Sequence, residues 1–205
     1  MAVLVAPTKS NLIKAKAALD LSNKGFELLD KKRNVLIKEM MSLVDRAKAI
    51  QGNIYVTLQE AYDQLQNVNI TTGIKNVENI TRSIPKDEEF DILLKSVMGV
   101  DIPTIKYSKV PVKPSYGFHN TNPALDAAAE RFRTVRYMMY ELAEIDNSVF
   151  KLAKEIQKTQ KRTNALQHIQ IPRYKEQVKY IQEALEEKER EDFFRLKRVK
   201  KRSAQ

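Results

Sequence analysis

The sequence predicts an all-α-dominated protein, in which a long antiparallel left-handed two-helix coiled coil carries a small central insertion. Three observations support this prediction: glycine occurs only 5 times in 205 residues, charged residues make up 30 %, and two long stretches repeat apolar residues at alternating three- and four-residue intervals. This composition and spacing are typical of coiled coils. We divide the chain into an N-terminal helix (1–73), a central head (74–121) and a C-terminal helix (122–205), in one elongated domain overall.

The N-terminal helix is predicted from a heptad seam that opens after Pro7 and Thr8. Its seam positions are Leu12, Ala15, Leu19, Ser22, Phe26, Leu29, Arg33, Leu36, Met40, Leu43, Ala47, Ile50 and Ile54. The phase then slips by one residue, through Leu58, Ala61, Leu65 and Val68. The β-branched, glycine-containing stretch "NITTG" at 69–73 is expected to end the helix, because both residue types weaken helices.

The C-terminal helix is expected to begin with Asn122 as its N-cap and Pro123 in its first turn. Its predicted seam positions are Leu125, Ala128, Phe132, Val135, Met139, Leu142, Asp146, Val149, Ala153 and Ile156. The seam becomes polar near Gln160 and Thr163, and resumes at Tyr174, Val178, Ile181 and Leu185. Since neither helix can bury its stripe alone, we expect an antiparallel intrachain pair.

Pairing Val68 with Leu125 sets the expected register of the two helices. It brings Leu12 near Ile181, and it leaves residues from about 182 onward without an intrachain partner. Phe193 and Phe194 lie on this overhang, followed by the basic run "RLKRVKKR" at 195–202. Because adjacent phenylalanines on an unpaired helix usually have a partner, the overhang is a candidate contact surface. Its residues are Phe193, Phe194, Arg195, Leu196, Lys197, Arg198, Val199, Lys200, Lys201 and Arg202.

The segment between the two long helices has a different character. Four of the seven prolines fall within 74–121, and apolar residues alternate with polar ones from Phe90. Alternation of this kind predicts a strand, Gly99 suits a turn, and Pro103 restricts the second strand to a sheet edge. We predict a short helix near 75–83 and a β-hairpin over 90–110. Because this alternation would expose apolar side chains, we hypothesise that the hairpin contacts an enzyme partner and modulates its activity.

Motifs for catalysis, nucleotide binding and metal binding are absent from the sequence. There is no phosphate-binding glycine-rich loop and no cysteine, so thiolate metal sites are excluded. His119 and His168 stand alone and are interpreted as structural or solvated. Four paired carboxylates lie in charge-rich stretches and are interpreted as solvated: Glu88, Glu89, Glu186 and Glu187. Four methionines lie at seam spacing and are interpreted as packing residues: Met40, Met41, Met138 and Met139. We therefore expect no catalytic residues, cofactor or metal ion.

Pro172 interrupts a stretch that otherwise predicts an uninterrupted helix. It lacks a backbone donor and crowds the carbonyl group of His168, four residues earlier. The cost of such a residue in a helix interior is about 3 kcal/mol. We expect a kink in the second helix at this position.

Five strings of this sequence resemble the D subunit of the rotary V-type and archaeal A-type ATPases, and together they cover the chain nearly end to end. They are "APTKSNL" at 6–12, "GFELLDKKRNVLIKE" at 25–39, "VMGVDIP" at 97–103, "RTNALQHIQIPRY" at 162–174 and "EREDFFRLKRVKK" at 189–201. The resemblance implies a non-catalytic central rotor shaft that transmits torque to a membrane ring that translocates protons or sodium ions. The shaft would stand in a catalytic hexamer of A and B subunits. It would bind the F subunit on its side and dock on the C subunit (also called d).

The resemblance also implies where the protein works. It would belong to a peripheral sector at the cytoplasmic face of a membrane, without inserting into it. The longer C-terminal extension of eukaryotic vacuolar versions is absent, which leads us to expect a bacterial or archaeal source. In this setting a fixed kink at Pro172 would make the shaft eccentric and press it unequally on its neighbours.

The net charge of +10 supports a rival interpretation, a basic coiled coil that binds nucleic acid or acts as a scaffold. Apart from Phe193 and Phe194, no aromatic residues interleave the basic run, and stacking aromatics are what single-strand binders need. A second rival, a helix lying on a membrane surface, requires an exposed apolar face. Here the apolar stripe is needed for the partner helix, so both rivals rank below the rotor shaft.

Overall fold

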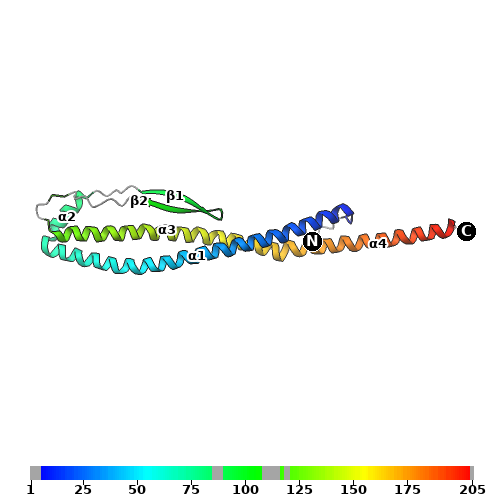
Figure 1. Ribbon diagram of the computed structural model, residues 1–205, viewed down its shortest axis with the longest axis horizontal. Helices are drawn as coiled ribbons and strands as arrows, with labels where there is room; N and C mark the ends of the chain where they lie inside the picture. The colour runs from blue at the N-terminus through cyan, green and yellow to red at the C-terminus, as the bar shows by residue number, and fades with distance from the viewer. Residues whose placement is uncertain (1–5, 85–89, 108–115, 118–120, 204–205) are drawn as a thin grey trace. The chain divides into compact units, whose positions relative to one another are not determined.

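The structure, a computed structural model, describes residues 6–84, 90–107, 116–117 and 121–203. It contains two compact units, which are described separately below. The central unit is Leu36–Glu155, and the terminal unit combines Met1–Val35 with Ile156–Gln205. The elements are α1 (Lys9–Thr72), α2 (Ile74–Ser83), β1 (Phe90–Val97), β2 (Val100–Tyr107), α3 (Pro123–Ala165), a π-helical turn η1 (Leu166–Gln170) and α4 (Ile171–Ser203). Figure 1 labels all of them except η1.

The ends of the long helices follow the local sequence. At the start of α1, the Thr8 hydroxyl oxygen accepts a hydrogen bond from the Asn11 amide at 3.2 Å, as an N-cap does. The helix ends before Gly73, whose φ of 84° is in the left-handed region that glycine tolerates best. α3 begins at Pro123, and the Asn122 carbonyl accepts a hydrogen bond from the Leu125 amide at 2.8 Å. These three predicted helix ends are confirmed.

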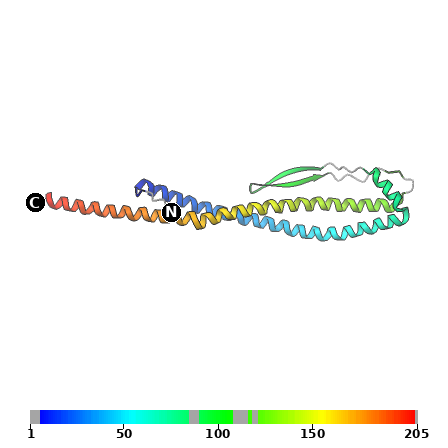
Figure 2. The ribbon, with the colours of Figure 1, turned by 180° about the vertical axis from the view of Figure 1, so that it is seen from behind.

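In the central unit, α1 and α3 lie side by side and run in opposite directions (Figures 1 and 2). Arg46 forms an ion pair with Glu141 at 2.9 Å, and Glu60, further along α1, pairs with Arg131 at 3.3 Å. The residue further along α1 therefore pairs with the residue nearer the start of α3, as an antiparallel pair of helices requires. At the end of α1, the predicted pairing is confirmed by one buried cluster that also includes α2, made of Val68, Val77, Leu125 and Ala128.

In the terminal unit, the first part of α1 pairs antiparallel with the end of α3 and with α4. Arg33 donates a hydrogen bond to Gln160 at 2.8 Å, and Lys9 forms an ion pair with Glu189 at 3.3 Å. The second contact corrects the predicted start of the overhang. Pairing does not stop near residue 182 but reaches Glu189, because the long side chains of Lys9 and Glu189 meet beyond the last apolar seam position.

The predicted seam of the first helix is confirmed, but that of the second is out of phase at three positions. No predicted seam residue of α1 is exposed, and Leu36 is completely buried. On α3, however, Met139 is 56 % exposed and Asp146 and Ala153 also face solvent. The buried residues are instead their neighbours Ile145 and Leu152. An aliphatic side chain gains more from burial than an aspartate or an alanine, so the helix turns this face inward.

The predicted central elements are present. α2 begins close to the predicted position, and β1 and β2 form an antiparallel two-stranded sheet in the register Phe90↔Tyr107 to Val97↔Val100. The two-residue turn has positive φ at both Met98 (51°) and Gly99 (77°), as a type I′ turn requires. Predictions that fall on 85–89, 108–115 and 118–120, including those for Glu88, Glu89 and His119, lie outside the described residues.

Tyr116 donates a hydrogen bond to the Asp126 carboxylate near the start of α3. Burial, together with this bond, raises the pKa of Tyr116 to about 12 from its usual 10.0. Since the folded-state pKa is raised, the stabilisation is complete below pH 10 and is lost as the pH rises from 10 to about 12. We expect a late-titrating tyrosine in a nuclear magnetic resonance titration of ring-labelled protein, absent in Tyr116→Phe. Titration of Tyr116 together with exposed tyrosines would contradict this expectation.

Candidate interaction surfaces

The last part of α4 extends beyond the start of α1 in the terminal unit (Figures 1 and 2). Its apolar side chains face solvent: Phe193 is 65 % and Phe194 62 % exposed, and Leu196 and Val199 are similar. The two phenyl rings contact each other edge to face, with centroids 6.4 Å apart. The apolar half of the predicted contact surface is therefore accessible to a partner.

Apolar side chains lie on two faces of this helix end, with basic side chains between them. Phe193, Leu196 and Val199 follow at three-residue intervals and share one face, while Phe194 lies about a quarter turn away from Phe193. The basic residues lie between and behind them. A helix that is apolar on one face fits a groove, whereas one that is apolar on several faces fits a partner that surrounds it.

Part of the basic charge is compensated within the helix. Arg195 forms ion pairs with Glu191 at 3.4 Å and with Asp192 at 3.7 Å, and all three side chains are exposed. Exposed pairs at these spacings stabilise a helix by only a few tenths of a kcal/mol. They leave the residues after Arg195 as the more strongly basic section of the surface.

The structure contains a π-helical turn, Leu166–Gln170, immediately before the turn that holds Pro172. In a π-helical turn each amide bonds to the carbonyl five residues earlier instead of four. This change of hydrogen-bond spacing comes directly before Pro172, which has no amide to donate. The helix can thus pass the proline without a break between α3 and α4. The sequence indicated the position of this irregularity but not its type. A kink at Pro172 stays a prediction.

The polar section of the predicted seam is packed inside the terminal unit. Arg33 forms an ion pair with Asp30 at 2.5 Å in addition to its bond to Gln160. Thr159 and Thr163 are almost fully buried, and the Thr163 hydroxyl donates to the Thr159 carbonyl at 2.9 Å. Because these groups bind each other or the backbone, they make a satisfied polar layer and not an open site.

The hairpin packs on α3 through the edge of β2. Tyr107 stacks on Tyr137 with ring centroids 4.9 Å apart. The Ile105 amide donates to the Glu144 carboxylate at 2.8 Å, and the Lys151 ammonium donates to the Asp101 carbonyl at 3.0 Å. Sequence reasoning missed Glu144 and Lys151 as anchors of the hairpin. A carboxylate and an ammonium seven residues apart lie on one face of a helix, but nothing in the sequence says which strand they bind.

The part of the chain that the structure describes contains no candidate metal centre. No three His, Cys, Asp or Glu side chains there are grouped so that they could hold a metal ion. His168 lies in the exposed π-helical turn, and Glu186 and Glu187 lie on the exposed surface of α4. Nor does any described helix have a segment both long and apolar enough to span a bilayer.

Comparison with known proteins places the whole chain in one group. The family model for the D subunit of ATP synthase matches residues 11–201. The V-type ATP synthase D subunit of Thermotoga neapolitana is 43 % identical over 200 residues, covering 98 % of each chain. The A-type ATP synthase D subunits of Thermococcus sibiricus and Methanopyrus kandleri are 40 % and 39 % identical over 96 % of this chain, covering 93 % and 85 % of their own lengths.

Proposed function

The chain belongs to the family of ATP synthase D subunits, and we propose that it is the central-stalk rotor subunit of a rotary V/A-type ATPase. The match over 11–201, with full-length relatives of that name in bacteria and archaea, is the observation that carries this proposal. In this role the chain is not catalytic. It transmits torque between the nucleotide-hydrolysing hexamer of A and B subunits and the ion-translocating ring, at the cytoplasmic face of the membrane.

The packing of the chain supports a mechanical role. In each unit the long helices are joined by a continuous seam and by pairs such as Arg46–Glu141 and Lys9–Glu189. A pair of helices resists bending and twisting better than one helix, because side chains interdigitate along its length. Torque transmission further needs an asymmetric surface that favours different conformations of the surrounding subunits in turn.

The exposed end of α4 is the segment that we assign to the hexamer. Phe193, Phe194, Leu196 and Val199 would contact the inner wall of the hexamer, and Arg195, Lys197, Arg198, Lys200, Lys201 and Arg202 would meet acidic side chains there. The F subunit would bind on the side of the helix pair, and the C (or d) subunit would connect the chain to the membrane ring. The nucleic-acid alternative has weaker support, since Arg195 is already paired and the family match is to an ATP synthase subunit.

Reconstitution tests the proposal directly. The chain is to be co-expressed with the A, B and F subunits of its source organism and purified through a tag on A. We expect this chain to co-purify in a complex whose ATPase activity depends on its presence. Failure to co-purify, together with tight and strongly salt-dependent binding to duplex DNA, would support the nucleic-acid alternative instead.

Binding of the F subunit should raise the melting temperature of the chain. The polar seam layer around Arg33 and Gln160 buries little apolar surface, and a partner that binds only the folded state stabilises it by mass action. The measurement is a thermal melt followed by circular dichroism, with and without a saturating amount of F. An unchanged melt despite binding demonstrated by gel filtration would contradict the expectation.

Pro172→Ala tests whether the irregular turn contributes to rotation. Alanine supplies the missing amide and is favoured in helix interiors by up to about 3 kcal/mol, so we expect a higher melting temperature. If the irregularity makes the shaft press unequally on the hexamer, the same variant should lower ATP-driven rotation while the complex still assembles. Unchanged rotation in a complex with a more stable shaft would remove Pro172 from the mechanism.

A further inference from the structure

In the terminal unit, the inward residues of α1 follow a regular seven-residue repeat. They recur at alternating three- and four-residue intervals, and the exposed residues between them come in stretches of one or two. A partner helix can follow such a repeat along its length only if its own inward residues keep the same spacing. The inward residues of α1 are Leu12, Ala15, Leu19, Ser22, Phe26, Leu29 and Arg33.

The partner helix departs from this spacing at one place. Between Ile156 and Leu185, a range that the structure describes throughout, exposed residues come in stretches of two, except for 167–170, where four follow one another. The inward residues on either side of this stretch, Leu166 and Ile171, are five residues apart where the repeat calls for four. The partner helix thus contains one residue more than the repeat of α1 can accommodate.

In a regular α-helix this extra residue would break the pairing downstream. Each residue turns an α-helix by about 100°, so one extra residue would rotate all later side chains by more than a quarter turn. Yet Ile181 is completely buried, and Val178 borders the same surface depression as Leu19 of α1. The rotation must therefore be taken up before these residues.

The π-helical turn η1 lies where the extra residue occurs. The Ile171 amide donates to the Leu166 carbonyl, five residues earlier, so this turn contains one residue more than an α-helical turn. Leu166 still faces α1 at the start of the turn, because a methyl group added at Gly25 would lie 3.9 Å from its Cδ1 atom. The surplus is carried by the exposed side of the turn, and both of its ends remain on the seam.

We propose that η1 is a phase correction: it absorbs one residue and thereby keeps the apolar seam of α4 aligned with that of α1. Pro172 does not cause the irregularity in this account, because a proline removes an amide but leaves the number of residues between seam positions unchanged. The inference depends on the packing of the terminal unit alone and not on the proposed function.

Two single-residue deletions test the proposal. Both are made in Pro172→Ala, because proline would itself distort a regular helix at this position. Deletion of His168, an exposed residue of η1, shortens the five-residue interval to four. It should turn η1 into a regular α-helical turn with every seam residue still facing α1. We expect this variant to melt at the temperature of Pro172→Ala or above it.

Deletion of Lys175 is the matched comparison, because this residue is also exposed but lies in α4. Its loss turns Val178 and Ile181 away from α1 if η1 persists, and Ile171 and Tyr174 if η1 becomes α-helical. Apolar burial is lost either way, so the melting temperature should fall by about 5–10 °C. Circular dichroism measures both melts.

Two controls separate a lost side chain from a lost position. His168→Ala and Lys175→Ala, in the same background, keep the residue count and should each shift the melting temperature by less than about 2 °C. The chain has no cysteine, so spin labels at Lys16→Cys and Gln182→Cys report the distance across the helix pair. This distance should stay the same without His168 and change without Lys175.

Two results would overturn the proposal. In the first, the chain without His168 melts as low as the chain without Lys175, or does not fold. The interval at η1 would then be needed as it is. In the second, the chain without Lys175 melts as high as Pro172→Ala and keeps the same label distance. The pairing of α1 with α4 would then not depend on the phase of the seam.

Discussion

A chain that ends after Arg190 is expected to fold and to lose most of its affinity for the catalytic hexamer. The truncation keeps the Lys9–Glu189 ion pair, the last intrachain contact between α1 and α4 described above. It removes Phe193 and Phe194, whose burial in a partner contributes about 2 kcal/mol each. Together these correspond to about a thousandfold in affinity. The measurements are helicity by circular dichroism, binding of the F subunit, and titration of the A/B hexamer.

Two substitutions within the full-length chain separate apolar from basic contributions. Replacing both Phe193 and Phe194 by serine should reproduce most of the loss seen on truncation. Neutralising Lys200, Lys201 and Arg202 should weaken assembly mainly at low salt, because exposed charges act more on encounter than on affinity and are screened by salt. A truncated chain that assembles with full affinity and supports full rotation would show that the end of α4 is not the contact.

Leu36→Ala and Leu152→Ala should each lower the free energy of unfolding by about 2–5 kcal/mol. Both side chains are completely buried in the central unit, so the substitution loses apolar burial and leaves a cavity. Leu28→Ala is the matched control: the residue is also a leucine on α1, but its side chain is exposed. Urea unfolding followed by circular dichroism measures all three variants.

We expect the control to change stability by less than about 0.5 kcal/mol, as exposed substitutions usually do. Equal effects of Leu28→Ala and Leu36→Ala would contradict the packing described here, because they would place both side chains in the same environment. The comparison also tests the corrected seam. Leu152→Ala should be costly, whereas replacement of the predicted seam residue Asp146 should be mild.

The seam of α1 could be predicted from sequence because many of its apolar residues stand between charged neighbours, as Ala15 and Ala47 do. The seam of α3 could not be predicted residue by residue. At three predicted seam positions the preceding residue is also apolar, so a strict seven-residue repeat fits the sequence in two phases. Met138 precedes Met139, Ile145 precedes Asp146 and Leu152 precedes Ala153. Only packing against α1 decides between them: it buries Ile145 and Leu152, the larger aliphatic side chains of their pairs, and leaves Met139 exposed.

The hairpin and its turn could be predicted because strand alternation and Gly99 are local signals. Its attachment to α3 could not, since the Ile105–Glu144 bond joins residues 39 positions apart and uses a backbone group. The unpaired length of α4 was overestimated for a similar reason. The Lys9–Glu189 ion pair is made by long charged side chains that lie outside the apolar seam, so the seam alone does not report it.

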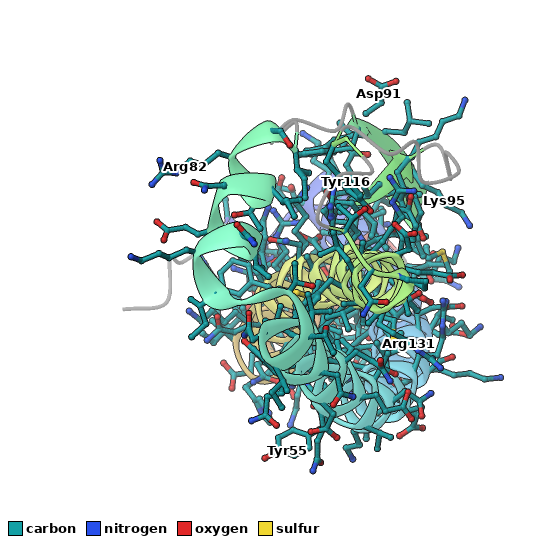
Figure 3. All side chains as sticks on the ribbon, turned by 90° about the vertical axis from the view of Figure 1, so that its left-hand side faces the viewer. Tyr55, Arg82, Asp91, Lys95, Tyr116 and Arg131 are labelled. Atoms are coloured by element: carbon teal, nitrogen blue, oxygen red, sulfur yellow. The ribbon has the colours of Figure 1, made fainter. Side chains whose placement is uncertain are left out.

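The central claim, that this chain turns inside an A/B hexamer, is tested most directly by observing its rotation. The chain contains no cysteine, so Tyr55→Cys provides a single attachment point on α1. The Tyr55 side chain is 76 % exposed and points away from the helix pair (Figure 3). With the hexamer fixed to a surface and a bead attached at this position, we expect the bead to rotate in one direction when ATP is added. A bead that stays still while the same complexes hydrolyse ATP would contradict the rotor function.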